Sequence, residues 1–325
     1  MQPGPSSLPP VPANRLAWEA VPGTLRQRAE EHLAGRVADA VTQPGGFTPG
    51  AAARLLLADG RRVFAKAVGP EPNPDYPVIY RAEARITAGL PSAAPVPRLL
   101  GSFEEGGWVM LLLEDIDGRL PAEPWVPAEL DRVLDGLTVL AGALTPAPAG
   151  LAAPTAAERL GGKFSGWRRL AAARDKGDSL AGLDPWAHRN LTRLAGLESL
   201  WVQAAQGGSL VHADMRADNL LLTDDRVYFV DWPLACTAQP WFDLVAMLPS
   251  IAMQGGPSPE MICQAHPVTK AADPDAVTAV LAAVAGYCVR QSRQPPPPGM
   301  PTVRQFQHAA GRSALDWLRQ RTQWR

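Results

Sequence analysis

The chain has 325 residues, enough to bury a substantial core and to form two domains or one two-lobed domain. Its formal net charge is −1 with both signs well mixed, which argues against binding to nucleic acid or an anionic membrane. No apolar run approaches about 18 residues, and the N-terminus lacks a secretory pattern. Three cysteines without paired spacing suit a reducing compartment. We therefore expect a cytoplasmic protein, and composition leaves its oligomeric state open.

The first third of the chain predicts a lobe of antiparallel β-structure. Residues 1–15 are rich in proline and are expected to form a disordered lead-in. Two amphipathic runs predict helices, at residues 24–33 and 79–90. Short apolar runs predict strands at residues 37–41, 51–57, 62–68, 97–103 and 107–113. Asp59 and Gly60, between the second and third of these strands, are the clearest hairpin signal in the chain.

The pattern changes after Glu114, where a polar break precedes a long region of helical periodicity. We place the boundary between the lobes here, giving residues 16–114 and 115–325. Helices are predicted at residues 127–144, 165–173, 185–205, 241–253, 275–291 and 303–320. Four consecutive prolines, 295–298, are expected to form a stiff spacer between the last two.

One stretch of this second lobe combines several polar residues with two short apolar runs. His212, Asp214, Asn219 and Asp231 surround the runs 220–222 and 227–230, which read as a hairpin. Asn219 and Asp231 would stand at opposite ends of the hairpin, where oxygen ligands for a hard cation such as Mg²⁺ belong. Asp214 would be free to meet a substrate hydroxyl. The plainer alternative is a surface hairpin in which Asp214 and Asn219 cap turns.

These residues resemble the catalytic and metal-binding segment of aminoglycoside phosphotransferases and related small-molecule kinases. That family has a metal-binding Asp followed by a helical Asp, and here Asp243 follows Asp231 by twelve residues. The resemblance implies an α+β, two-lobed, protein-kinase-like fold, with a small antiparallel β lobe containing one helix and a larger, mainly helical lobe. It also implies ATP and Mg²⁺ as cofactors and a small-molecule hydroxyl as acceptor. Asp231 is followed by Trp-Pro and not by the Phe-Gly of protein kinases. We therefore expect no switchable activation segment.

Two features of the first lobe would hold the phosphates. Lys66 interrupts an apolar strand and needs a partner, unless it lies on a solvated face. Glu83 lies on the next helix, and in the resembling kinases such a pair holds the α- and β-phosphates; alternatively Glu83 is a solvated carboxylate. Gly45 and Gly46 lie in a glycine-containing turn that could approach the triphosphate, although proline and glycine also mark ordinary loops.

The resemblance assigns further roles to residues of both lobes. The backbone around Glu114 and Ile116 would bond adenine, as the family's lobe connector does. In the other lobe, Asp214 would accept or orient the acceptor's proton. Arg216 would face the transferred phosphate or, equally well, form a salt bridge with Asp218. His212 is expected to be structural rather than a proton carrier.

The acceptor is less well defined by sequence. Beyond residue 250 there are eight basic and four acidic residues, which does not suit a polycationic aminoglycoside. Four aromatic residues either line a pocket for an apolar or neutral hydroxyl compound or belong to the core; they are Trp232, Trp241, Phe242 and Trp317. A kinase of choline, homoserine or a sugar is equally compatible. The alternative of another class is a catalytically inactive nucleotide-binding or sensor protein of the same fold.

Overall fold

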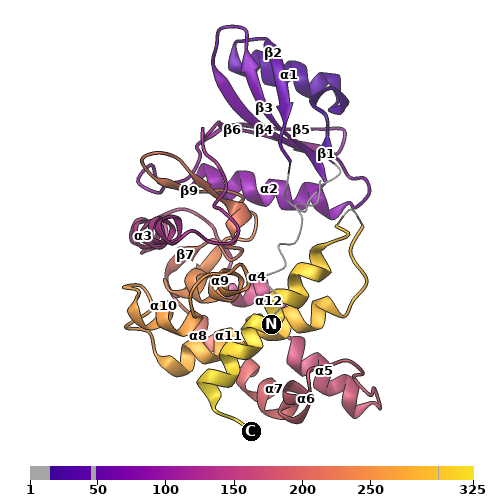
Figure 1. Cartoon of the computed structure of the whole chain (residues 1–325). Helices are drawn as coiled ribbons and strands as arrows, with labels where there is room; N and C mark the ends of the chain where they lie inside the picture. Colours follow the sequence, from indigo (N-terminus) through magenta and orange to yellow (C-terminus); the bar gives the residue numbers. More distant parts are fainter. Residues whose placement is uncertain (1–14, 45–48, 299) are drawn as a thin grey trace.

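The computed structural model describes residues 15–44, 49–298 and 300–325. It consists of a smaller lobe built on a β-sheet and a larger, mainly helical lobe, as the sequence predicts (Figure 1). The predicted lead-in lies outside the described residues except for Arg15, which begins the first strand.

The small lobe contains every strand predicted for it. In chain order its elements are β1 (Arg15–Leu16), the 3₁₀ turn η1 (Trp18–Ala20), α1 (Gly23–Leu33), β2 (Val37–Thr42), β3 (Gly50–Leu57), β4 (Arg62–Val68), α2 (Asp75–Ala88), β5 (Leu99–Glu105) and β6 (Trp108–Glu114). The sheet order is β1-β3-β4-β6-β5, with β2 also paired to β3. All pairs are antiparallel except β1 with β3. The lobe thus carries α1 in addition to the one helix, α2, that the family resemblance implies.

The two faces of this sheet are covered by different helices. Side chains alternate along a strand, so Ala65 and Ala67 pack into the apolar cluster beneath α1 and η1. Phe64 and Val68 face the other way, toward Tyr80 of α2. Lys66 is two residues from both Phe64 and Val68, so its side chain lies on the same face of the sheet as theirs. It therefore points toward α2 and not toward solvent, and Figure 1 shows α2 between the sheet and the helical lobe.

Helix α2 begins four residues earlier than the apolar periodicity predicts, at Asp75. Its first turn contains Pro77. Proline is tolerated in the first turn of a helix, because the N–H it lacks would have no intrahelical acceptor there. The predicted hairpin between β3 and β4 is present, with Gly60 at φ 87°, a conformation that glycine adopts without strain.

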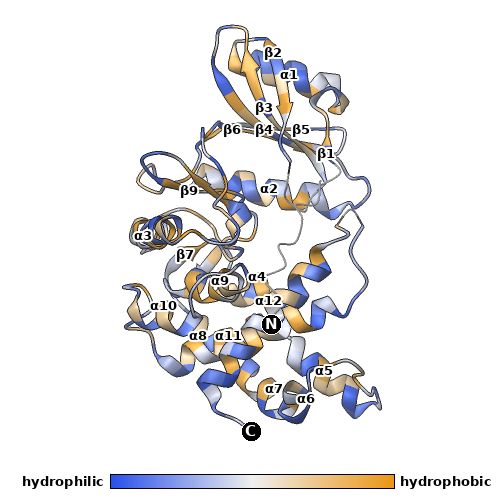
Figure 2. Ribbon diagram, in the orientation of Figure 1, coloured by the Kyte–Doolittle hydropathy of each residue, from blue (hydrophilic) through white to orange (hydrophobic). Residues whose placement is uncertain are grey.

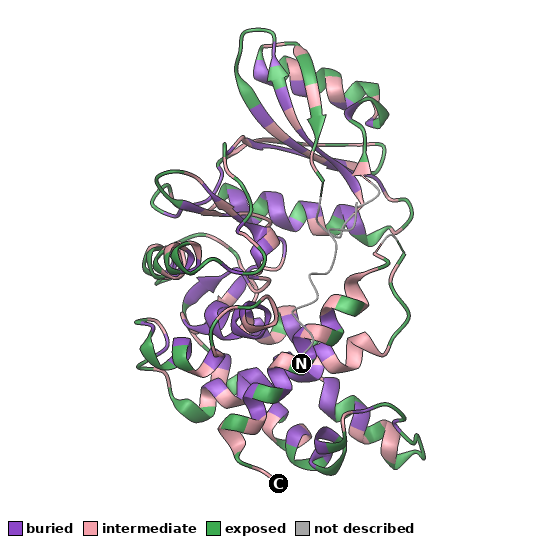
Figure 3. Cartoon of the chain, in the orientation of Figure 1, coloured by how far each residue is buried: buried purple, intermediate pink, exposed green. Residues whose placement is uncertain are grey.

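The large lobe combines helices with two short two-stranded sheets. Its elements are α3 (Pro127–Ala143), α4 (Ala156–Leu160), α5 (Gly166–Asp175), α6 (Pro185–Arg189), α7 (Leu191–Ser199), α8 (Trp201–Ala205), β7 (Ser209–Val211), η2 (Ala217–Asn219), β8 (Leu220–Leu222), β9 (Val227–Phe229), β10 (Cys236–Ala238), α9 (Phe242–Met253), α10 (Pro259–Ala265), α11 (Pro274–Ser292) and α12 (Val303–Thr322). The β8–β9 hairpin matches the prediction, whereas the β7–β10 pair was not foreseen. Buried residues concentrate in the sheets and inner helices, and outer helices such as α12 carry both polar and apolar side chains (Figures 2 and 3).

The single helix predicted for residues 185–205 is wrong, because the chain breaks into α6, α7 and α8. Asn190 stands at the first break and is buried. Its Nδ2 donates to the carbonyls of Trp186 and Arg325, each at 3.1 Å. Such side-chain bonds compete with continuous helix, which apolar periodicity alone does not reveal.

Helices α5 and α11 cross in close contact at two glycines. A Cβ added at Gly166 would lie 1.9 Å from the carbonyl oxygen of Gly286, which is backbone and cannot rotate away. Beside the crossing, the buried carboxylate of Glu198 accepts the N–H groups of Trp167 and Arg168, each at 3.0 Å. The start of α5 is therefore fixed against α7 and α11.

Gly166→Ala should destabilise the protein by about 3 kcal/mol or more, since overpacking against immovable backbone is costly. Gly196→Ala in α7 is the matched control, because no atom lies within 4 Å of the added Cβ. It should stabilise the helix by roughly 0.5–1 kcal/mol. Thermal unfolding of the two variants measures both effects, and equal melting temperatures would contradict the packing argument.

Candidate functional site

A single lysine links the two lobes. Lys66 Nζ of β4 donates to Glu83 Oε2 of α2 at 2.6 Å and to Glu83 Oε1 at 2.7 Å. The same ammonium donates to Asp231 Oδ1, which follows β9 in the large lobe, at 2.7 Å. Residues separated by 165 positions in the chain therefore meet at one cation.

The charges of this cluster depend on one another. Burial opposes the charged form of Lys66, but the carboxylates of Asp231 and Glu83 outweigh it and raise the lysine pKa. Burial also raises the pKa of Glu83. At Asp231 burial acts in the same direction, yet the Lys66 ammonium prevails and lowers the pKa of that carboxyl. Lys66 is thus a permanent cation shared by two acids, with the Asp231 side chain 40% exposed.

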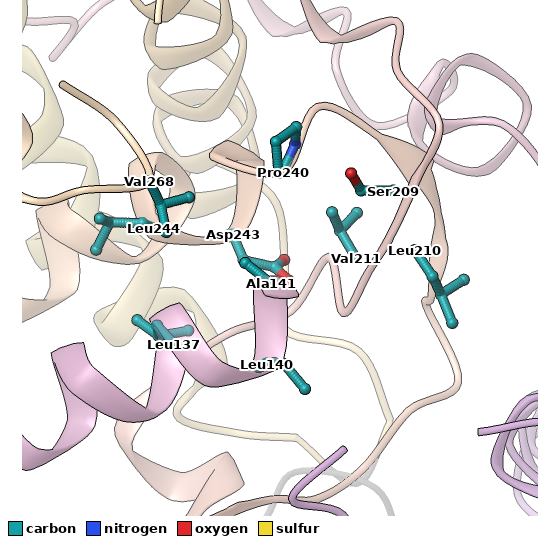
Figure 4. Close-up of a pocket in the computed structure, with 10 residues that line it drawn as sticks. All are labelled: Leu137, Leu140, Ala141, Ser209, Leu210, Val211, Pro240, Asp243, Leu244 and Val268. Carbon is teal, nitrogen blue, oxygen red and sulfur yellow. The ribbon is translucent and has the colours of Figure 1, made fainter. Parts of the chain in front are cut away.

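Asp243, in the first turn of α9, binds the backbone of the loop that follows β7. Its Oδ2 accepts the N–H of His212 at 2.7 Å and its Oδ1 accepts that of Ala213 at 2.8 Å. Ala213 has φ 61°, a left-handed conformation that is unfavourable for alanine. Asp243 borders an internal cavity of about 20 Å³, which Figure 4 shows between residues of α3, β7 and α9. The buried carboxylate thus holds the loop in a conformation it would not adopt alone.

His212 is fully buried, and both of its ring nitrogens are engaged. Nε2 lies 2.8 Å from the Val230 carbonyl, and Nδ1 accepts the backbone N–H of Asp214 at 3.2 Å. The ring also packs edge-on against Trp232. These contacts join the Asp214 loop to the segment before Asp231, and a structural role for His212 stays our prediction.

Asp214 and Asp218 lie on either side of one guanidinium. Arg216 Nη1 donates to both oxygens of Asp214, at 3.0 and 3.2 Å, and its Nε and Nη2 donate to Asp218 at 2.9 and 3.0 Å. The salt bridge to Asp218 that we weighed for Arg216 is therefore present. Burial raises the pKa of Asp214, and the Arg216 charge acts against that rise.

Asn219 and Asp231 have oxygens that fit a hard cation. Asn219 Nδ2 donates to the Asp214 carbonyl at 2.8 Å, and its backbone carbonyl accepts the Val230 N–H at 3.0 Å. Among the described residues nothing donates to Asn219 Oδ1 or Asp231 Oδ2. One carboxylate and one amide oxygen suit Mg²⁺, which keeps several waters and binds substrate phosphates. Within the same residues no group of three or more His, Cys, Asp or Glu side chains could hold a metal ion.

The connector between the lobes has backbone N–H groups without acceptors in the described structure, among them that of Ile116. Across the described part of the chain, the Ile116 N–H has no acceptor, whereas its carbonyl accepts Arg54 Nη2 at 2.8 Å and the Gly118 N–H at 2.9 Å. The Glu114 side chain accepts Arg98 Nε at 3.2 Å, and its N–H bonds the Arg98 carbonyl.

Sequence reasoning missed the clamp on this connector. Asp115 is buried, at 1% side-chain exposure, and it pairs with Arg62 at 2.7 Å and with Arg54 at 3.2 Å. These two arginines belong to β4 and β3, so the clamp ties the connector to the sheet. The sequence did contain a signal for this clamp: Arg54 and Arg62 lie on neighbouring predicted strands, and Asp115 lies in a run of acidic residues. Gly45 and Gly46, predicted to approach phosphate, lie outside the described residues.

The model of the phosphotransferase enzyme family (APH) matches residues 49–309. No curated protein sequence matches the chain. Solved structures match its fold with low identity, among them a thermostable mutant of an aminoglycoside phosphotransferase in ternary complex with ADP and hygromycin B. That match has a TM-score of 0.60 and 13% identity and covers 93% of this chain and 100% of the other.

Two further solved structures have the same fold. A choline/ethanolamine kinase family protein from Mesorhizobium loti has a TM-score of 0.56 and 16% identity, covering 93% of this chain and 95% of the other. A spectinomycin phosphotransferase in complex with ADP and spectinomycin has a TM-score of 0.57 and 11% identity, covering 90% and 93%. In the part of the chain described here, none of the helices has the length and apolar character needed to span a membrane.

Asp243→Ala should destabilise the protein by about 2–4 kcal/mol, because it leaves the buried N–H of His212 and the part-buried N–H of Ala213 without an acceptor. Ala213→Gly changes the same loop but removes the cost of an alanine in the left-handed conformation. Its effect on protein stability should be neutral or stabilising by up to about 1 kcal/mol. Chemical denaturation of both variants measures the difference. An Asp243→Ala protein as stable as wild type would contradict the proposed support of the loop.

Proposed function

Because the chain belongs to the phosphotransferase enzyme family, we propose that it is an ATP-dependent kinase that phosphorylates a hydroxyl group of a small molecule. The observation that carries the proposal is the Lys66 ammonium, which joins Glu83 of the small lobe to Asp231 of the large one. We propose residues 16–114 as the nucleotide-binding lobe and residues 115–325 as the lobe that holds the acceptor. A cytoplasmic location remains a prediction.

The phosphate grip centres on Lys66. Its ammonium is charged at any physiological pH and is positioned by Glu83, so it is placed to bind phosphate oxygens. Bound nucleotide would compete with Asp231 for this cation. Solved structures of similar fold in complex with ADP support nucleotide binding by this chain.

Mg²⁺ would be held by Asn219 Oδ1 and Asp231 Oδ2, and when bound it neutralises charge on the phosphates. This chain contributes the placement of those ligands. The Asn219 amide is oriented by its bond to the Asp214 carbonyl. Asp231 takes φ 71°, an uncommon left-handed conformation for a residue other than glycine. For adenine, the unpaired Ile116 N–H supplies a donor on the clamped connector.

Asp214 is the base of the proposed transfer. The acceptor hydroxyl oxygen forms a bond to the γ-phosphorus, the bond from that phosphorus to the β-γ bridging oxygen breaks, and ADP leaves. The hydroxyl proton passes to the Asp214 carboxylate. Burial favours this uptake by raising the pKa of Asp214. Arg216 holds both oxygens of the base in a fixed orientation and stands beside the place where the phosphoryl group would pass.

The aromatic residues considered for an acceptor pocket do not support one. Trp232, Trp241, Phe242 and Trp317 are exposed by 5% or less and belong to the core, which was the alternative reading. The acceptor must be recognised by other side chains. The shortage of carboxylates beyond residue 250 supports an acceptor other than a polycationic aminoglycoside.

The direct test is ADP formation from MgATP with a panel of hydroxyl compounds. Asp214→Asn should lower turnover by at least about 10²-fold, since the loss removes the base, and should leave the MgATP-induced rise in melting temperature intact. Asp225→Asn is the matched control, because this exposed hairpin carboxylate pairs only with its neighbours Thr223 and Arg226. Equal turnover in Asp214→Asn would contradict the assignment. Binding of MgATP without turnover on any acceptor would favour the nucleotide sensor instead.

The acid limb of kcat/KM should report the titration of Asp214. The carboxylate form is active, so activity falls as pH drops through a pKa raised above the ordinary aspartate value of about 4. Arg216→Gln removes the cation that opposes this rise, so the limb should move to higher pH. Arg226→Gln should leave the limb in place. An unchanged or downward-shifted limb in Arg216→Gln would contradict the electrostatic account.

A further inference from the structure

A surface pocket of about 720 Å³ lies between α5 and the C-terminal end of α11. Its volume is in the range of small-molecule sites, roughly 300–1,000 Å³. Arg169 and Lys176 line it from the α5 side and Arg290 and Arg293 from α11. None of these residues has a role in the proposed phosphate grip or in the metal site.

The pocket is strongly positive. Four cations face one carboxylate, Asp178, whose Oδ1 already accepts the Leu180 N–H at 2.8 Å. In the described structure none of the four cations forms a salt bridge, and Arg169 donates only to Ser165 Oγ and the Gly162 carbonyl. Burial and the neighbouring Arg169 and Arg304 lower the pKa of Arg290. Clustered cations without counter-charges are the arrangement that an anionic ligand stabilises.

Helix α11 carries both a pocket residue and a residue near Asp214. Tyr287 and Arg290 are three residues apart and so share one helix face, with Arg290 about 4.5 Å along the axis from Tyr287. The Tyr287 hydroxyl accepts Gln307 Nε2 at 3.3 Å. It also lies within electrostatic reach of Asp214 and Arg216. A small molecule along this face could place one end at Asp214 and the other among the arginines.

The second wall near Asp214 is also basic. Lys163, after α4, interacts electrostatically with Asp214, Arg159 and Arg216. Arg159 Nε is buried and has no hydrogen-bond partner among the described residues. Both carboxylates here, Asp214 and Asp218, are already bound by Arg216. Lys163 and Arg159 would repel a cationic acceptor, whereas Asp214, Asp218 and the nearby Glu123 together outnumber the Arg216 charge, so the cations of the pocket carry the preference for an anion.

We propose that the acceptor is an anionic hydroxyl compound, whose carboxylate or phosphate group lies among Arg169, Arg290 and Arg293 while its hydroxyl reaches Asp214. This inference rests on the proposed kinase function and specifies its substrate class. Arginine suits the task, because its planar guanidinium binds the two oxygens of a carboxylate or phosphate together.

The test measures ligand-induced shifts in melting temperature with MgADP present, at constant ionic strength. The probes are glycerate and glycerol 3-phosphate as anions, glycerol as the neutral counterpart and choline as the cationic one. The anions should stabilise wild type, and glycerol and choline should not. In the double variant Arg169→Gln/Arg290→Gln, the anion concentration needed should rise on the order of tenfold or more. The two anions distinguish a carboxylate site from a phosphate site.

The control is Arg189→Gln, which removes one exposed positive charge from α6 outside the pocket and should behave as wild type. A retained MgADP shift shows that the double variant is folded. Stabilisation by choline or glycerol in place of the anions, or an anion response equal in wild type and the double variant, would overturn the proposal. Loss of the MgADP shift from wild type would instead count against the kinase function, so the two failures are distinguishable.

Discussion

The structure depends on one cation placed between two acids from different lobes. Lys66 bonds Glu83 at 2.6 Å and Asp231 at 2.7 Å, in a position only 12% exposed. Removing Lys66 would leave the buried Glu83 carboxylate without its counter-charge and would cost several kcal/mol, whereas removing either acid leaves the lysine paired with the other. The same interaction therefore joins the lobes and prepares a phosphate-binding cation. This arrangement explains why a lysine is placed in the middle of an apolar strand.

Around the Lys66 cluster, buried side chains hold the backbone of the segments that carry the site residues. Asp243 holds two N–H groups of the loop that carries Asp214, and His212 joins that loop to the strand before Asp231. Asp115 performs the same task for the connector, through Arg54 and Arg62. Each support is a buried acid or imidazole that binds main chain or arginine. The positive φ of Ala213 is held by its bond to Asp243.

Residue order and periodicity predicted the strands of the small lobe, the β8–β9 hairpin and most helices, because these follow from local pattern. They also proposed Lys66 and Glu83 as a pair, and the alternation of Phe64, Lys66 and Val68 places the lysine on the face covered by α2. The sequence could not reveal the Asp115 clamp or the break at Asn190, since both depend on contacts between distant segments. Whether the tryptophans faced a pocket or the core was also undecidable from spacing. The α5–α11 pocket appears only when two helices separated by about a hundred residues are brought together.

The central claim is that Lys66 binds the phosphates of a nucleotide. Isothermal titration of MgATP into wild type, Lys66→Met and the control Lys270→Met, which changes an exposed lysine, tests it most directly. We predict that Lys66→Met weakens binding by at least about tenfold, the effect of losing a charge-assisted bond, while Lys270→Met binds like wild type. A folded Lys66→Met protein that binds MgATP with wild-type affinity would contradict the account.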